Sequence, residues 1–422
     1  MESIDLFNKL AKSNLEFPSL ERYPAKFCNY CAKEVAPKLS FGKRPIVNDL
    51  SLQSSESATQ YLVEMTICEY CGLHQLIHEI NPVAFYTDYM TPSNWKNEPH
   101  IYKLVEEIGK LAEPHHSIID IGCNDGKFLM ALKNHGFENL YGIEPTKNTA
   151  DAAKSAGFKV TNSYLNIEIA ETLVRENAEF DVVVTRQVLE HIKDIRGFLL
   201  SARTLLRDDG FLVIEVPDSE MNFTHSDYGV WEEHLNYFTK ISLTRILNEM
   251  GWEITTWYRS IFSGWCQTFI ATPASIPELS NIQIGRAGVS SEIDGFDAWV
   301  SNFESFKAHV RRKIDELVGD EGRIALFGVG SRSISTLYSL DLINRITAAY
   351  DDNKEKIKKY IPGGRIQIAP SVSIRKDEIE LILLGVNFEN EGKVLPKLEL
   401  NGIQVRSILP PSQFLLWDDF ID

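Results

Sequence analysis

The sequence has no long apolar run. No segment of its 422 residues approaches the roughly 18 consecutive apolar residues that a membrane-spanning helix needs. The opening stretch, MESIDLFNKLAKSNLEF, carries acids and no apolar core of the kind that marks a secretory signal. We therefore expect a cytoplasmic protein with no membrane partner.

Basic residues are also scarce. Lys and Arg number 43 against 59 Asp and Glu, which gives a formal charge of -16. Sequence-independent binding to nucleic acid or to an anionic membrane requires a basic surface, so this balance argues against both. The length predicts two or three domains, and a composition that is 44% hydrophobic and 24% charged is that of an ordinary soluble protein. We expect a small-molecule partner and a monomer or small homo-oligomer.

Only six cysteines occur, and four of them form two CxxC pairs, Cys28 with Cys31 and Cys68 with Cys71. Two such pairs are the ligand set of a structural zinc site, because each pair presents two thiolates to one metal. The intervening stretch is longer than in most zinc ribbons. A redox pair and a disulfide pair are the alternatives, and a cytosolic chain of this size favours zinc.

The stretch IIDIGCNDGKF, residues 118–128, has the pattern around which the rest of the chain is organised. A β-branched strand ending in Asp120 leads through a turn with Gly122, Asn124 and Gly126 into a helix, as in nucleotide-binding sheets. The next strand places Glu144, followed by Pro145, at its carboxyl end. A carboxylate there can accept the hydroxyl groups of a ribose.

These two motifs and FDVVVTRQVLEHI, residues 180–192, together resemble the leading motifs of class I S-adenosylmethionine-dependent methyltransferases. The resemblance implies a cofactor site on the residues just named, with Arg186 and Glu190 from the third motif. Tyr89, in an aromatic segment that is a candidate lid, can reach the methionine part of the cofactor or simply pack. The cofactor-site residues are Asp120, Gly122, Asn124, Gly126, Glu144, Pro145, Arg186, Glu190 and Tyr89.

Helices and strands alternate from residue 101 to about 272, which predicts a doubly wound, mainly parallel sheet. Prolines and glycines from 273 to 295 predict a break. An amphipathic helix at 296–318 and a second α/β unit follow. The predicted α/β architecture thus has four parts: residues 1–80, a helix and zinc module; 81–275, a methyltransferase domain; 276–318, a linker and connecting helix; and 319–422, a Rossmann-like substrate-binding domain.

This order of parts, with several local motifs, resembles the zinc-containing nucleotide-sugar C-methyltransferases of deoxysugar pathways, of the C-3 methyltransferase type. The motifs are CNYC, CEYCGLHQL, EHLNYF (233–238) and LFGVGSRSISTLY (326–338). The resemblance implies S-adenosylmethionine, structural zinc and a nucleotide-linked 4-keto sugar that is methylated next to its ketone.

The resemblance also places the catalytic base in WEEHLNYF. His234 is the expected base because imidazole titrates near neutral pH, and Glu233 can orient it. Tyr228 or Tyr237 can substitute for a tyrosine that the family has and this chain lacks. The family has a tyrosine three positions before the histidine, where this chain has Trp231. FSGWCQTF (262–269) also replaces a His-Gly-Gly-Ser segment. The alternative reaction is therefore O- or N-methylation of a nucleotide-linked sugar or another small metabolite. The alternative role of His234 is that of a hydrogen-bonded packing residue.

Overall fold

The computed structural model describes residues 26–54, 58–78, 80, 98–274, 286–375, 378–399 and 403–420. The expected N-terminal helix and the aromatic segment with Tyr89 lie outside these residues. Three sheets organise the rest, and we refer to residues 26–80 as the N-terminal module, 98–274 as the central domain and 319–420 as the C-terminal domain. Among the helices of the described residues, none is both long and apolar enough to cross a membrane.

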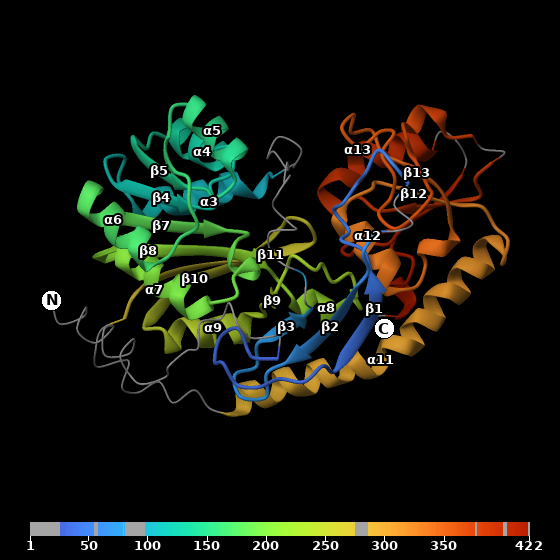
Figure 1. The fold of residues 1–422 in the computed structure, drawn as a ribbon, viewed down its shortest axis with the longest axis horizontal. Helices are drawn as coiled ribbons and strands as arrows, with labels where there is room; N and C mark the ends of the chain where they lie inside the picture. Colours follow the sequence, from blue (N-terminus) through green and yellow to red (C-terminus); the bar gives the residue numbers. More distant parts are fainter. Residues whose placement is uncertain are drawn as a thin grey trace.

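A seven-stranded sheet forms the central domain, in the order β10-β11-β8-β7-β4-β5-β6 (Figure 1). Strands β4 to β8 run parallel, whereas β11 is antiparallel to both β8 and β10. The strand order reverses beside β4, and in such sheets ligands bind outside the carboxyl ends of the strands at that point. The strands are β4 (Ser117–Ile121), β5 (Asn139–Ile143), β6 (Lys159–Thr161), β7 (Phe180–Arg186), β8 (Leu206–Pro217), β10 (Trp252–Ile261) and β11 (Trp265–Pro273).

Helices cover both faces of this sheet. Their apolar sides are buried against the sheet, whose central strands β4 and β7 are almost entirely buried, as expected for the middle of a parallel sheet. The helices are α3 (His100–Leu111), α4 (Lys127–His135), α5 (Lys147–Ser155), α6 (Ile167–Asn177), α7 (Ile195–Leu205), α8 (Glu220–Thr224) and α9 (Lys240–Glu249). A 3-10 turn, Leu189–His191, follows β7.

The C-terminal domain has a second doubly wound sheet, entirely parallel, in the order β14-β13-β12-β15-β16. Its order also reverses beside its first strand, which creates a second ligand crevice of the same type. The predicted α/β fold with two Rossmann-like domains is confirmed. The elements are β12 (Ile324–Phe327), α12 (Ser331–Ser339), β13 (Ile346–Tyr350), β14 (Ile368–Ala369), β15 (Leu381–Leu384), α13 (Phe388–Glu399) and β16 (Gln404–Ser407).

The N-terminal module is a small antiparallel sheet, and the central domain supplies its last strand. Strands β1 (Leu39–Arg44), β2 (Tyr61–Ile67) and β3 (His74–Ile77) pair in order, and β3 then pairs with β9 (Asn236–Tyr237). Since β9 follows directly on the WEEHL segment, the module is bonded to the loop that holds the expected catalytic base.

A long helix, α11 (Arg286–Val318), precedes the C-terminal domain in the chain and packs against the N-terminal module. It runs along the lower right edge of the molecule in Figure 1. The apolar face expected from the sequence is confirmed, because Trp299, Phe303, Phe306, Val310 and Ile314 are all buried. They share one hydrophobic core with the module sheet and the C-terminal sheet.

The sequence predicts a break from 273 to 295 and a helix that begins at residue 296. This prediction was wrong for the start of the helix, because α11 begins at Arg286. Gly288 and Gly295 lie inside α11. A glycine within a helix costs about 1 kcal/mol relative to alanine. The buried aromatic face outweighs that cost, because burying a single Phe side chain contributes roughly 1.5–3 kcal/mol.

Candidate functional site

The carboxyl ends of the two parallel sheets face one continuous cavity of about 1780 Å³. The central domain forms one wall and the C-terminal domain the opposite wall. Residues 46–50 of the N-terminal module form a third side. Pockets for a single small ligand are commonly about 300–1000 Å³, so this cavity has room for two.

The turn after β4 shapes the central-domain wall. Gly122 has φ +80°, and a Cβ there would lie 2.4 Å from Cγ2 of Val188. Only glycine therefore allows the chain to turn so close to the segment after β7. Gly126, with φ +83°, precedes α4 and directs the first turn of that helix toward the cavity.

Glu144 lies at the carboxyl end of β5 and lines the cavity, as the sequence predicts, and Pro145 lies beside it. Its Oε2 accepts a hydrogen bond from the backbone N–H of Asn124 at 3.0 Å, and its Oε1 accepts one from Thr146 at 2.8 Å. These bonds fix the carboxylate while each oxygen keeps a further lone pair for a ligand. Glu144 thus holds the backbone of Asn124 on this wall of the cavity.

Asp120 is buried at the end of β4 and also lines the cavity. Burial raises the pKa of Asp120 to about 7, while the nearby Arg186 opposes this shift. Asp120 thus gains or loses a proton near neutral pH.

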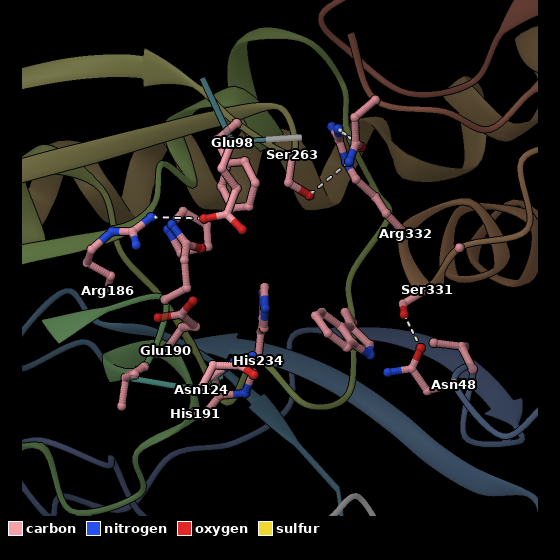
Figure 2. A pocket seen from close by; sticks show the side chains of 18 of the residues that line it. Asn48, Glu98, Asn124, Arg186, Glu190, His191, His234, Ser263, Ser331 and Arg332 are labelled. Atoms are coloured by element: carbon pink, nitrogen blue, oxygen red, sulfur yellow. Dashed lines mark hydrogen bonds and ion pairs between the residues drawn. The ribbon is translucent and has the colours of Figure 1, made fainter. Parts of the chain in front are cut away.

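Arg186, at the end of β7, organises a buried charge cluster on the same wall. It forms ion pairs with Glu98 and Glu215, each at 3.3 Å, and lies over the ring of Phe128. Burial alone would raise the pKa of Glu215, but Arg186 and His100 outweigh it and hold the pKa at about 2. Arg186 is consequently a fixed cation, and Glu98 presents its carboxylate beside it in the cavity. Figure 2 shows this pair on one side of the pocket.

His234 lies between the two walls, with Glu190 and His191 next to it (Figure 2). One imidazole nitrogen of each histidine and one carboxylate oxygen of Glu190 lie within 4.8 Å of one another. The ring of His234 lies 4.9 Å from that of His191 and 4.6 Å from that of Trp231, between centroids. The sequence motifs that carried Glu190 and His234 therefore converge, although 44 positions separate these two residues.

The hydrogen bond of His191 determines its tautomer. Its Nδ1 lies 2.8 Å from the backbone carbonyl of Glu233. A carbonyl can only accept, so Nδ1 carries the proton and Nε2 is the basic nitrogen of the neutral ring. His191 stands next to Glu190 in the third sequence motif and, like Glu190, lines the cavity.

The other two expected catalytic residues are held by different partners. The carboxylate of Glu233 accepts a hydrogen bond from Nδ2 of Asn48 at 2.8 Å. The hydroxyl of Tyr237 accepts one from the backbone N–H of Trp231 at 2.8 Å, and burial raises the pKa of this phenol. Tyr237 therefore supports the loop at Trp231, although it also borders the cavity.

The turn from Gly328 to Arg332 forms the opposite wall. The backbone N–H of Val329 donates to Asp351, which lies just after β13, and Lys356 donates to both the Val329 carbonyl at 2.7 Å and Asp351 at 3.1 Å. Arg332 forms an ion pair with Asp227 of the central domain at 2.8 Å. This turn is the counterpart of the one after β4. Arg332 in the turn and Lys356 beside it are each paired with a carboxylate, and each has more N–H donors than that contact uses, which suits an additional anionic ligand.

The four cysteines of the two CxxC pairs converge, as predicted. Cys28 Sγ lies 3.4 Å from Cys71 Sγ, and Cys31 Sγ lies 3.5 Å from Cys68 Sγ. These separations are far longer than a disulfide bond of about 2.05 Å and close to the roughly 3.8 Å between thiolates in a tetrahedral site with zinc–sulfur bonds of about 2.3 Å. The cluster is compatible with zinc, and all four thiols are free.

Several contributors to the site had no local sequence signal. Asn48 and Glu98 line the cavity through contacts with residues far away in the chain. The asparagine stands in a polar loop of the module, and nothing in the loop marks it. Polar residues are common in the loop after β1, so polarity alone does not distinguish Asn48 from its neighbours.

Two family models match the chain. One is described as a methyltransferase domain and matches residues 95–256, and the other is described as a C-methyltransferase C-terminal domain and matches residues 282–394. The first match defines the central part of the chain as a domain of the methyltransferase class. More particularly, the chain combines this methyltransferase domain with a C-methyltransferase C-terminal domain.

Similar curated proteins are also methyltransferases. A ubiquinone biosynthesis O-methyltransferase of Bradyrhizobium diazoefficiens is 31% identical over 100 residues, which is 23% of this chain and 38% of that protein. The EEF1A lysine methyltransferase 2 of Danio rerio is 26% identical over 132 residues, which is 28% of this chain and 56% of that protein. The chain thus spans less than two thirds of either relative.

Among solved structures, a magnesium protoporphyrin IX methyltransferase from Synechocystis with bound S-adenosylmethionine is 16% identical. It covers 41% of this chain and 76% of its own chain with a TM-score of 0.31, a likeness too weak to support an inference.

Proposed function

We propose that this chain transfers the methyl group of S-adenosylmethionine to the carbon next to the ketone of a nucleotide-linked deoxysugar. The observation that carries the proposal is the pair of strand-end crevices that face each other across one cavity, with His234 between them. The match to a C-methyltransferase C-terminal domain supports carbon as the acceptor. The cysteine cluster then serves as a structural zinc site.

The central-domain wall suits the cofactor. Glu144 would accept the ribose hydroxyls, the turn from Gly122 to Gly126 would approach the ligand closely, and Arg186 with Glu98 would face its charged methionine end. When bound, S-adenosylmethionine supplies an electrophilic methyl group on a sulfonium. The buried ion pair keeps both charges fixed, so the ligand meets an arrangement that is already ordered.

The C-terminal wall suits the nucleotide end of the substrate. Asp351 follows the second strand of its sheet, the position that Glu144 occupies in the other sheet, while Lys356 and Arg332 supply positive charge for a diphosphate. A substrate bound there would extend its sugar toward His234.

His234 would then remove the proton next to the ketone. A C–H beside a carbonyl becomes acidic enough for imidazole when the enolate oxygen is stabilised. Trp231, which stands where the resembled family has a tyrosine, packs beside His234 and lines the cavity. A basic His191 Nε2 nearby can accept the proton onward.

The test is mass spectrometry of nucleotide-linked sugars, keto and non-keto, incubated with the protein and S-adenosylmethionine. We expect one added methyl on a 4-keto sugar. Substrate deuterated next to the ketone should lose the label on carbon methylation and would keep it on O- or N-methylation. Addition only to non-keto compounds would overturn the proposal.

We predict that His234→Gln abolishes turnover while the affinity for S-adenosylmethionine, measured by calorimetry, stays near that of the wild type. Glutamine keeps the bulk of the side chain but cannot take a proton at neutral pH. His225→Gln is the matched control, because His225 lies earlier in the same segment and bonds Thr224 rather than bordering the cavity. Full turnover in the His234 variant would remove this residue as the base.

A further inference from the structure

The N-terminal module, rather than the central domain alone, holds the loop that carries His234. Arg44 and Glu232, each 1% exposed at the side chain, form an ion pair, and Arg44 also donates to the carbonyl of Val230. The backbone N–H of Val47 donates to Glu232, and Nε2 of His78 donates to the Glu232 carbonyl at 2.7 Å. A buried ion pair with additional hydrogen bonds fixes the geometry of a loop strongly.

Asn48 continues this set of contacts into the cavity. Its Nδ2 donates to the carboxylate of Glu233 at 2.8 Å, and its Oδ1 accepts a hydrogen bond from the hydroxyl of Ser331. The carboxylate accepts hydrogen bonds, which orients the amide nitrogen toward Glu233 and leaves the amide oxygen for Ser331. Figure 2 shows Asn48 and Ser331 facing each other across from His234.

Ser331 is the first residue of α12 and belongs to the turn that forms the C-terminal wall. Asn48 therefore links Ser331 of the C-terminal wall to Glu233, the residue that precedes His234. A side-chain amide is suited to this bridge, because it offers a donor to the carboxylate and an acceptor to the hydroxyl at once.

We propose that Asn48 is a positioning residue that couples ligand binding at the Ser331 turn to the placement of the Glu233–His234 segment. The four-cysteine module thereby takes part in methyl transfer by way of residues 44–48. This inference rests on the proposed function for the nature of the ligand, but the bridge itself is tested without substrate.

The first test is hydrogen–deuterium exchange of residues 230–237 in the free full-length protein. We expect faster exchange in Asn48→Ala and in Ser331→Ala, because each removes one end of the bridge. Ser54→Ala is the matched control: its hydroxyl donates to the Gly364 carbonyl, so it joins the same two parts of the molecule away from the cavity. Wild-type exchange in both bridge variants would overturn the proposal.

The second test adds uridine diphosphate or thymidine diphosphate as the probe. We expect binding to slow exchange at residues 230–237 in the wild type and in Ser54→Ala, and to leave it unchanged in Asn48→Ala. Equal protection in all three proteins would overturn the coupling. Failure of both probes to bind the wild type would instead count against the nucleotide part of the proposed function, while the first test still decides the bridge.

The third test uses the substrate found by mass spectrometry. Asn48→Ala and Ser331→Ala should each lower kcat about tenfold, which corresponds to roughly 1.4 kcal/mol, with unchanged affinity for S-adenosylmethionine. The double variant should be no slower than the worse single variant, since both changes break one bridge. If the losses in kcat multiply in the double variant, the two residues act independently and the coupling is overturned. A loss confined to KM would show an effect on substrate binding alone and would also overturn it.

Discussion

The side chain of Glu144 has two roles on the central-domain wall: it holds two turns in place, and it is expected to bind the ligand. Its two oxygens accept the N–H groups of Asn124 and Thr146, so it joins the turns after β4 and β5. The same carboxylate is the group that we expect to bind ribose.

We predict that Glu144→Ala weakens S-adenosylmethionine binding by about 1.5–3 kcal/mol, the usual value of hydrogen bonds to a charged acceptor. Calorimetry with S-adenosylhomocysteine measures the change. Glu144→Gln keeps one acceptor oxygen and should fall between the wild type and alanine. Unchanged affinity in the alanine variant would move the ribose site elsewhere.

A comparison of Gly122 with Gly136 separates the stability cost of a steric clash from that of backbone strain. Gly122 and Gly136 both have positive φ, but a Cβ at Gly136 would meet nothing within 4 Å. We expect Gly136→Ala to cost about 1–2 kcal/mol from strain alone. Gly122→Ala should cost about 1–3 kcal/mol more, because its Cβ would overlap Val188. Urea unfolding measures both, and equal losses would contradict a clash at Gly122.

At the scale of elements, β3 and α11 meet through a buried pair of titratable groups. His74 Nε2 lies 3.6 Å from Glu292 Oε2, a distance compatible with an ion pair. Burial, however, lowers the pKa of His74 to about 3 and raises that of Glu292 to about 7. At pH 5 both groups are therefore neutral, and the contact is not ionic.

This pair predicts a pH-dependent effect of Glu292→Gln. The pKa of Glu292 is higher in the folded protein than in the unfolded chain, so its favourable contribution is complete below about pH 4.5 and is lost as the pH rises through 7. Glutamine removes this dependence, and the variant should gain stability relative to the wild type between pH 5 and pH 8. Urea midpoints at the two pH values measure it, and a constant difference would contradict the prediction.

The elements also show what the sequence made predictable. Local apolar runs that end in polar residues predict the strands β4, β5, β7, β12 and β13. Because the carboxyl ends of parallel strands meet at one edge of a sheet, the convergence of those polar residues at two crevices could also be predicted. The start of α11 was missed because tertiary burial overrides its glycines. The Asn48–Glu233 contact spans 185 positions, and no local pattern encodes such a pair.

At the scale of the whole molecule, the cysteine cluster links the ends of the module. We predict that the purified protein holds one zinc ion per chain by mass spectrometry, and that Cys68→Ser loses it. Cys123→Ser, which changes a buried thiol in the turn after β4, should retain the metal, because Cys123 belongs to none of the candidate metal groups of the described residues. Because zinc binding contributes on the order of 10 kcal/mol to folding in small zinc domains, the Cys68 variant should also expose residues 26–78 to protease. Equal zinc content in both variants would contradict the site.

The core that α11 shares with its neighbours has a consequence for engineering. Leu39, Phe41 and Val63 of the module pack in the same cluster as α11 and the C-terminal strands. A chimaera made by grafting only residues 319–420 from a related protein would join two surfaces that did not evolve together. The transplantable unit is the C-terminal sheet together with α11 and the strands β1 and β2, so two separated stretches of the gene must be exchanged at once.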